Sequence, residues 1–591
     1  MPPLKIIKIY LLVVFLGLGH FQLQAQSTQA VKVIEKGKVI KDSLAAKGTH
    51  SYDLNLAAEQ FVFGDAFQSS VDVEVSIYDP TGDKIASFNK LARGSETFQF
   101  SSTTAGKYQI TVTPDNDEVG DYSIKLIKLE PIANTPSGKV SQLMSAFNEK
   151  TPGAVVAVVR NGKLIYGQGF GLANVEYDIP NSITTPYHLA SVSKQFTAFA
   201  IVMLANEGKL SLDEDIRKYL PDMPEFEHKI AVRHLLNHTS GLRDHWRLWT
   251  MSGGLMDDVI RQSDLLRLIK RQKQLNFKPG EQYLYSNTGY LLLSEIVTAV
   301  SGEKFADWMS TNIFKPLGMN STQIYDDHER IVKNRAYSYK NTDAGLAKRV
   351  LSYANSGATS LFSTAEDLAL WLGNFKTGKV GGKKAIEQLQ EQGMLNNGET
   401  INYALGVGIR EEYSLRKIYH GGADAGYRTY LSYYPELDAG IIVLSNLTGV
   451  SGWRVAKDVA LAFFGEHMVN KSKPKPKPKP KPKSTNASIA PEPKAKQEPW
   501  RPTPEDLSTY TGRYYSDELD TFYVISIEGS RLKISHTRHG DNFLTVKEKD
   551  VFSSEQRYLG ELTFIRSKDN KVEQFSLTNS RVRNLTLEKM N

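Results

Sequence analysis

The segment Lys473–Lys483 alternates six lysines with five prolines, and no packed core can include it. Proline fixes φ and has no N–H to donate, while neighbouring lysines repel one another. The pattern predicts an extended polyproline II segment, in which 11 residues at about 3.1 Å each span roughly 34 Å. We expect residues 471–500 to be a linker, with adhesion to anionic envelope polymers as the alternative role.

The length of the chain also excludes a single core. Its 591 residues exceed the roughly 250 to 300 at which one hydrophobic core stops growing. Changes in pattern predict an accessory β domain at 30–130, a mixed α/β domain at 135–470 and a small β domain at 501–591. The formal charge of +7 equals the number of lysines between 471 and 483, and 7 minus 7 leaves no excess charge elsewhere. No basic face for nucleic acid is therefore predicted.

The N-terminus predicts export. Lys5 and Lys8 precede the apolar run Ile9–Leu18, and Ala25 offers a small residue for cleavage. We expect a signal peptide at 1–25 and a periplasmic or extracellular mature protein, with a retained membrane anchor as the alternative. No later stretch is long enough for a transmembrane helix, so no anchor is expected after cleavage. The chain has no cysteine, which excludes disulfides and thiolate metal sites.

Two regions show the period-two alternation of half-buried strands. Residues 71–77 alternate apolar and polar side chains and predict a β-sandwich, in which we see no catalytic constellation. With the run Ala105–Tyr108, this region resembles jelly-roll accessory domains of secreted bacterial peptidases. Residues 523–534 predict a small antiparallel barrel, and the opening Tyr510–Tyr514 resembles the lipocalin-like domain that follows many β-lactamase-related hydrolases.

Ser191 and Lys194 are the first candidates for chemistry. They open an apolar helical pattern that stops at Gly208, and residues three apart share one helix face. A serine hydroxyl becomes a nucleophile when a neighbour takes its proton, and burial lowers the pKa of a lysine so that it can do so. The helix N-terminus also directs backbone N–H groups at an oxyanion.

The S-x-x-K pattern is common in this chain, so its context has to decide. Only Ser191 opens a buried apolar helix. The pattern also begins at Ser87, Ser301, Ser414, Ser472 and Ser530.

Tyr285 and Asn287 precede a second apolar helix, at residues 290–300. A phenol near cationic Lys194 is expected to have a depressed pKa and to share the proton, so that either group can be the main base. Asn287 is expected to hold a substrate amide.

His420, Gly421 and Gly422 are the third element, followed by an apolar strand at 441–444. We expect the segment to be an edge strand that lines a site. The rival K-T-G sequence at Lys376–Gly378 follows a helical pattern, so Gly378 is interpreted as a helix stop.

Together, Ser191 to Lys194, Tyr285 to Asn287 and His420 to Gly422 resemble the three motifs of the serine β-lactamase and D-alanyl-D-alanine carboxypeptidase superfamily, especially its class C-like branch. The resemblance covers about 135–470. It implies an α/β fold with an antiparallel sheet flanked by helices, and ping-pong acyl transfer without a cofactor. It also implies an oxyanion hole from the backbone N–H groups of Ser191 and Ala423.

The sequence allows several classes of substrate. A neutral His420 is a weaker counter-charge for a carboxylate than lysine, which disfavours β-lactamase activity. Peptides with D-amino acids, D-aminoacyl amides and esters all remain, so D,D-peptidase, D-aminopeptidase and esterase types are expected. The competing hypothesis is a non-catalytic, penicillin-binding-like protein that binds envelope peptides or polymers through its accessory β domains.

His234 and His238 have the spacing of two zinc ligands on a helix. A metalloprotease would need glutamate at the next position, and the chain has Leu235 there. We therefore interpret both histidines as structural and expect no metal.

Overall fold

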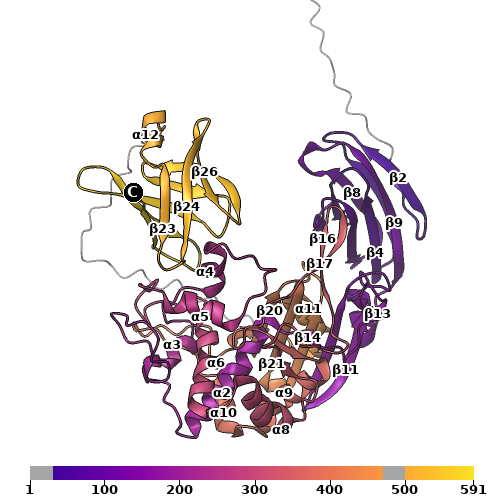
Figure 1. Cartoon of the computed structure of the whole chain (residues 1–591). Coiled ribbons are helices and arrows are strands. Elements are labelled where there is room, and N and C mark those ends of the chain that lie inside the picture. Colours follow the sequence, from indigo (N-terminus) through magenta and orange to yellow (C-terminus); the bar gives the residue numbers. More distant parts are fainter. Residues whose placement is uncertain (1–30, 470–499, 591) are drawn as a thin grey trace, which may run out of the picture. The chain divides into compact units, whose positions relative to one another are not determined.

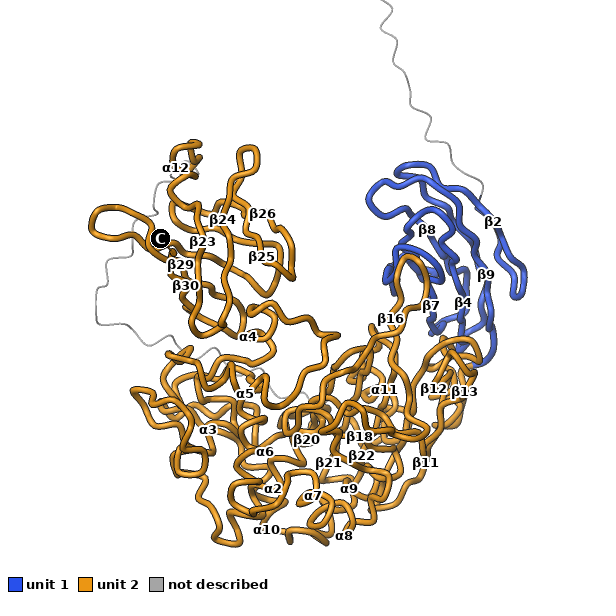
Figure 2. Tube along the Cα trace, viewed as in Figure 1, with its two compact units in different colours: residues 1–131 blue, residues 132–591 orange. Residues whose placement is uncertain are grey.

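The computed structural model describes residues 31–469 and 500–590. They form two compact units, Met1–Pro131 and Ile132–Asn591 (Figure 2). The predicted signal peptide at 1–25 and the extended linker at 471–500, except its last residue, lie outside the described residues.

The first unit consists of two sheets around one core. Residues of both sheets bury their apolar side chains in the same cluster, and Val73, Val75 and Ile77 of β5 have no exposed surface. The predicted β-rich N-terminal region is thus confirmed. The first sheet contains β1 (Lys32–Val33), β3 (His50–Leu56), β8 (Gly106–Pro114), β5 (Val73–Tyr78) and β6 (Lys84–Phe88). The second contains β2 (Val39–Leu44), β9 (Gly120–Pro131), β4 (Gln60–Gln68) and β7 (Gly94–Ser101).

A six-stranded antiparallel sheet forms the centre of the second unit. Its order is β11 (Lys163–Phe170), β10 (Ala154–Arg160), β22 (Ala439–Ser445), β21 (Tyr427–Tyr434), β20 (Leu415–Asp424) and β19 (Gly408–Glu412). Strand β10 is apolar from Ala154 to Val159 because both faces of this stretch are covered. Its Val156 and Val158 pack with α1 (Pro136–Leu143) and α11 (Gly452–Phe464). Val155 and Ala157 pack on the other face, in the cluster that includes α2 (Lys194–Asn206) and α9 (Ala365–Thr377).

The second unit also contains further helices and three small sheets (Figure 1). The helices are α2 (Lys194–Asn206), α3 (Val232–Leu236), α4 (His245–Met251), α5 (Gln262–Lys270), α6 (Asn287–Ser301), α7 (Phe305–Met309), α8 (Lys315–Leu317), α9 (Ala365–Thr377) and α10 (Gly382–Leu389). The small sheets pair β12 (Leu172–Asn174) with β13 (Ile179–Pro180), β16 (Ser338–Thr342) with β17 (Gly345–Arg349), and β18 (Leu361–Ser363) with both β14 (Tyr187–His188) and β15 (Gln323–Ile324). Helix α9 ends at Gly378 with φ +60°, so the rival K-T-G sequence is a helix stop, as predicted.

The C-terminal part is a closed eight-stranded barrel, which confirms the predicted barrel. It is closed because β23 (Gly512–Ser516) pairs with both β24 (Thr521–Glu528) and β30 (Leu585–Lys589). Leu248, Met251 and Leu268, from α4 and α5, belong to the barrel's own apolar cluster. After α12 (Pro504–Ser508) come β23 (Gly512–Ser516), β24 (Thr521–Glu528), β25 (Arg531–His536), β26 (Gly540–Glu548), β27 (Val551–Ser554), β28 (Glu561–Arg566), β29 (Val572–Thr578) and β30 (Leu585–Lys589).

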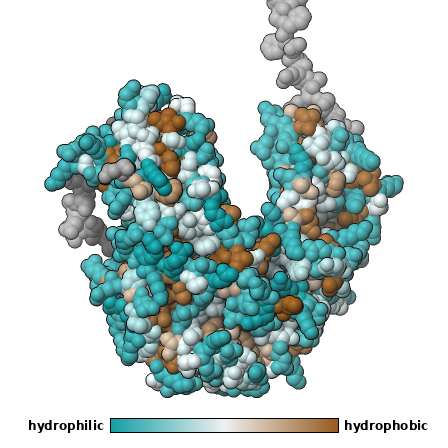
Figure 3. Space-filling view, in the orientation of Figure 1, coloured by the Kyte–Doolittle hydropathy of each residue, from teal (hydrophilic) through white to brown (hydrophobic). Residues whose placement is uncertain are grey.

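Among the residues described, no helix has the length and apolar character needed to cross a membrane. On the face of the second unit shown in Figure 3, hydrophobic residues stand in small groups among hydrophilic ones. One exposed aromatic side chain, that of Trp453, lines the cleft that contains Ser191.

Candidate active site

Ser191 lies in a short 3-10 turn, Ala190–Ser193, that continues directly into α2. The serine therefore precedes the α-helix that the sequence pattern predicts it to open, and it keeps the same three-residue spacing from Lys194. Ala190 has φ +50°, the left-handed region that an L-residue seldom adopts. This turn presents the serine at the surface of a cleft, while the lysine that follows is directed inward.

The Lys194 amine is completely buried beneath the cleft. Its Nζ lies 3.1 Å from Ser191 Oγ, 2.8 Å from Asn287 Oδ1 and 2.8 Å from the carbonyl oxygen of Ala358. Burial lowers the pKa of Lys194 to about 7, although the nearby carboxylates of Asp424 and Asp244 raise it. A substantial neutral fraction at neutral pH is what a lysine base requires.

Tyr285 also lies at this site, but its ionisation differs from the expectation. Lys194 Nζ is 5.0 Å from the centre of its ring. Burial raises the pKa of Tyr285 well above the ordinary value, and the hydrogen bond with Ser191 and the charge of Arg581 offset this only in part. The expected depression of the tyrosine pKa is therefore wrong, because the sequence pattern does not reveal that the phenol is fully buried. Tyr285 is a neutral proton donor here, which leaves Lys194 as the candidate base.

Asn287 begins α6 and connects the lysine to a carboxylate. Its backbone N and its Nδ2 both donate to Asp244 Oδ2, each at 2.8 Å, which leaves Oδ1 to accept from Lys194. Asp244 caps α4 by accepting from Trp246 N at 3.2 Å. No catalytic motif in the sequence marks Asp244, although its position just before a helix is a recognisable capping signal.

His420, Gly422 and Ala423 lie in the second half of β20. Strand β19 pairs only with residues 415–419 of β20. In this first half β20 is therefore an inner strand, whereas residues 420–424 form the edge of the sheet. The prediction of an edge strand is therefore right only for the residues that line the cleft. A Cβ on Gly422 would collide with Thr429 Oγ1 and with the carbonyl oxygen of Leu189, just before the turn that contains Ser191.

His420 is a neutral imidazole. Its Nδ1 donates to the carbonyl oxygen of Gly421 at 2.7 Å, so Nε2 accepts from the hydroxyl of Tyr403 at 3.0 Å. Burial, and then the charge of Lys194, lower the pKa of His420 to about 3. The interpretation of His420 as a poor counter-charge for a carboxylate agrees with this geometry.

The site residues surround one cleft of about 570 Å³. Ser191, Tyr285, Asn287 and the segment His420–Ala423 all line it. Ten further residues line the cleft, and five of them, with charged or indole side chains, were missed from the sequence because no local pattern marks them. They are Trp246, Asp424, Arg428, Trp453 and Arg581.

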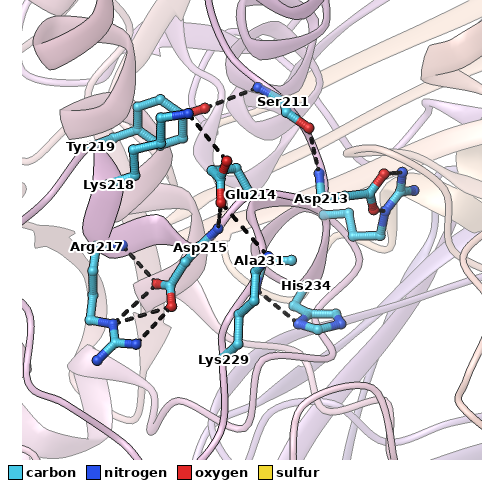
Figure 4. Close-up of polar contacts among 11 residues, drawn as sticks. Ser211, Asp213, Glu214, Asp215, Arg217, Lys218, Tyr219, Lys229, Ala231 and His234 are labelled. Atoms are coloured by element: carbon cyan, nitrogen blue, oxygen red, sulfur yellow. Dashed lines mark hydrogen bonds and ion pairs between the residues drawn. The ribbon is translucent and has the colours of Figure 1, made fainter.

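The rings of His234 and His238 accept hydrogen bonds from backbone N–H groups. Helix α3 ends at Leu236, so the two histidines do not share a helix as expected. His234 Nδ1 accepts from Ala231 N at 3.1 Å (Figure 4), and His238 Nδ1 accepts from Ser286 N at 3.2 Å. The centres of the His238 and Tyr285 rings are 4.2 Å apart, so the histidine packs against the tyrosine. Within the ranges that the structure describes, no group of three or more histidine, aspartate or glutamate side chains could hold a metal.

A serine beside a buried lysine, at the start of a helix that packs in a fold with an antiparallel sheet flanked by helices, is an arrangement for acyl transfer. The Beta-lactamase family model matches residues 140–462, more than half of the chain, and the chain therefore belongs to that family. At the level of the family, this supports a serine hydrolase.

Two curated relatives and one solved structure set the extent of the similarity. "Penicillin-binding protein 4*" of Bacillus subtilis is 31% identical over 312 residues, which cover 49% of this chain and 67% of the relative. A "D-aminopeptidase" of Brucella anthropi is 27% identical over 302 residues, 51% of this chain and 57% of that protein. The solved octameric penicillin-binding protein homologue from Pyrococcus abyssi aligns with a TM-score of 0.50 at 24% identity, over 77% of this chain and 100% of that chain. The last similarity shows the fold alone.

Proposed function

We propose that this chain is an exported serine hydrolase that forms an acyl-enzyme at Ser191. The observation that supports it most is the contact between the Lys194 amine and the Ser191 hydroxyl, 3.1 Å apart, with the lysine fully buried. Acyl transfer needs a base within hydrogen-bond reach of the nucleophile and a pKa near the working pH. Lys194 meets both conditions, because burial brings its pKa to about 7.

In the proposed reaction, neutral Lys194 accepts the proton of Ser191 Oγ as that oxygen attacks an ester or amide carbonyl. The carbonyl oxygen becomes an oxyanion, for which the backbone N–H groups of Ser191 and Ala423 are the candidate donors. Protonated Tyr285 gives a proton to the leaving alcohol or amine and recovers it from Lys194. Water then attacks the acyl-enzyme with the same groups, which releases the acid and restores the serine.

The substrates that fit this proposal are esters, amides and peptides that contain D-amino acids. The names of the relatives, a penicillin-binding protein and D-aminopeptidases, point in this direction. β-Lactams are less favoured because His420 is neutral. Binding of envelope polymers by the two β-rich accessory parts stays a prediction.

Hydrolysis of p-nitrophenyl esters by the purified chain tests the proposal. Ser191→Ala is expected to abolish turnover, and Lys194→Met to lower kcat about 10²- to 10⁴-fold through loss of the base. Ser530→Ala is the matched control, because Ser530 begins another S-x-x-K pattern but lies at an exposed position beside β25 in the barrel. Esters, D-alanyl-D-alanine peptides, D-aminoacyl amides and nitrocefin together would identify the acyl donor. Turnover that survives Ser191→Ala would contradict the proposal, and binding without turnover would favour the non-catalytic alternative.

A further inference from the structure

The loop at 579–584, between β29 and β30 of the barrel, forms hydrogen bonds with Asn276 and Asp244, which precede α6 and α4. Asn276 Nδ2 donates to the carbonyl oxygen of Arg581 at 3.1 Å, and Asn276 Oδ1 accepts from Arg583 N at 2.8 Å. The backbone N of Asp244 also donates to the Arg581 carbonyl oxygen, at 3.4 Å. All three contacts on the loop use its backbone, so its position does not depend on the side chain of Arg581.

A buried ion pair holds the same junction. The Arg243 side chain has no exposed surface, and its Nη1 donates to both carboxylate oxygens of Glu518, at 2.8 and 3.2 Å. Its Nη2 donates to the carbonyl oxygen of Arg583 at 3.0 Å. The next residue in the chain, Asp244, fixes Asn287 and through it the catalytic lysine. The barrel loop is thus anchored to the backbone that organises the cleft.

Arg581 brings a positive charge to this cleft. Its guanidinium carbon lies 4.9 Å from the centre of the Tyr285 ring, its side chain is 35% exposed, and it lines the same cleft as Ser191. Across the described ranges, the only hydrogen bond or ion pair of the guanidinium is a 3.6 Å contact between Nη1 and Asp244 Oδ2. Asp244 is already satisfied by three N–H donors, from Asn287 and Trp246. The guanidinium therefore has donors available for a ligand.

The other candidates for an anion partner are each engaged by neighbouring groups or uncharged. Arg428 Nη1 donates to the carbonyl oxygens of Tyr427 at 2.7 Å and of Ala425 at 3.4 Å. His420 is neutral, and Lys194 is buried with three partners. Asp424 makes the Arg428 side of the cleft more negative, since its carboxylate lines the wall there.

We propose that Arg581 binds a carboxylate of the acyl donor, and that the barrel thereby selects anionic substrates for the Ser191 site. The inference rests on the proposed function. A guanidinium matches a carboxylate geometrically through paired N–H donors, and such charge-assisted bonds are stronger than neutral ones. The positive charge that His420 cannot supply comes instead from the far end of the chain.

Two esters of matched length test this assignment. The monoester of adipic acid with p-nitrophenol carries a carboxylate, whereas p-nitrophenyl hexanoate has a methyl group at that end. The measured quantity is the ratio of kcat/KM for the two esters, after subtraction of spontaneous hydrolysis. This ratio does not depend on how much of a variant is folded.

Arg581→Gln should lower the adipate-to-hexanoate ratio ten- to a hundred-fold, the size expected for the loss of a charge-assisted hydrogen bond. Arg581→Lys should retain part of it. Arg583→Gln is the matched control, because Arg583 lies in the same loop but its Nη1 donates to Gln282, away from the cleft lining. A ratio that Arg581→Gln changes less than two-fold, or that Arg583→Gln lowers equally, would overturn the inference alone. Absence of turnover of both esters by the unmodified chain would overturn the proposed function and this inference with it.

Discussion

Lys194 combines two properties that a single residue seldom has: full burial and direct contact with a serine hydroxyl. Burial disfavours the ammonium form, whereas Asp424 and Asp244 favour it, and the balance places the pKa at about 7. Tyr285 and His420 do not titrate near neutrality, because burial moves their pKa values in opposite directions away from it. Of these three side chains, only Lys194 should therefore change its ionisation near neutral pH.

This predicts a simple pH–rate profile. A lysine base works only when neutral, so kcat/KM for an uncharged ester should rise as pH increases through about 7 and then stay level. Asp424→Asn should move the midpoint to lower pH, since it removes a carboxylate that raises the lysine pKa. Arg581→Gln should move it to higher pH, because Arg581 lowers that pKa. Midpoints that do not move in opposite directions would contradict the role of Lys194 as base.

For single residues, the sequence predicted which side chains meet and how Lys194 and His420 ionise, but not how Tyr285 does. Ser191, Lys194 and Tyr285 lie in local patterns whose spacing and apolar surroundings are visible in the sequence. The pKa of Tyr285 depends instead on burial by distant segments, so its predicted direction was wrong. Asp244 was missed because its partner Asn287 belongs to a different helix.

Among the elements, β20 and the turn before α2 fit each other through one glycine. Gly422 leaves no room for a Cβ beside Thr429 and the Leu189 carbonyl, whereas a Cβ on Gly421 would come no closer than 3.4 Å to another atom, in the Tyr430 ring. Of the two neighbouring glycines, only Gly422 therefore lies too close to other atoms to carry a Cβ.

Alanine substitutions should expose this difference. Gly422→Ala is expected to lower the unfolding free energy by about 1–3 kcal/mol through overpacking and to suppress ester hydrolysis, since the collision is beside the turn that contains Ser191. Gly421→Ala should have a much smaller effect on both. Thermal unfolding and steady-state rates of the two variants provide the comparison. Equal losses in both variants would show that the fit at Gly422 is not the determining contact.

For helices and strands, the sequence predicted the features that depend on local pattern. The apolar stop at Gly208 and the end of α9 at Gly378 matched the prediction, because both depend on local backbone conformation. The place of β20 within the sheet did not, since it depends on how far β19 pairs along it. His238 was assigned to a helix that ends two residues earlier.

For the whole molecule, the second unit contains several buried or half-buried histidines that are kept neutral. Burial lowers the pKa of His188 and His420 to about 3, and that of His234 and His245 to about 4. Once unfolded, each has an ordinary pKa near 6.5 and binds a proton below it. The unfolded chain then gains protons that the folded chain does not, so acid favours unfolding.

Stability should therefore be highest above pH 6.5 and fall as pH decreases toward 4. Each of these histidines contributes a slope of up to about 1.4 kcal/mol per pH unit in that range. His234→Gln should reduce the slope, since His234 accepts a backbone hydrogen bond away from the cleft lining and glutamine keeps an acceptor. Unfolding free energies at several pH values measure it. A variant with the same pH slope as the unmodified chain would contradict this account.

At the same scale, the sequence predicted the barrel but not its contribution to the site. Alternating strands predict a closed sheet from local pattern, whereas the position of Arg581 over Tyr285 depends on how the barrel packs on α4 and α5. No spacing in the sequence connects these residues.

The proposed reaction requires that Ser191 becomes acylated. Mass spectrometry of the chain, quenched soon after addition of an activated ester, measures this directly. The predicted result is a mass increase equal to the acyl group, located on the peptide that contains Ser191, which is absent in Ser191→Ala and slow to appear in Lys194→Met. An unmodified Ser191 during measurable turnover, or an acyl group on another residue, would contradict the account.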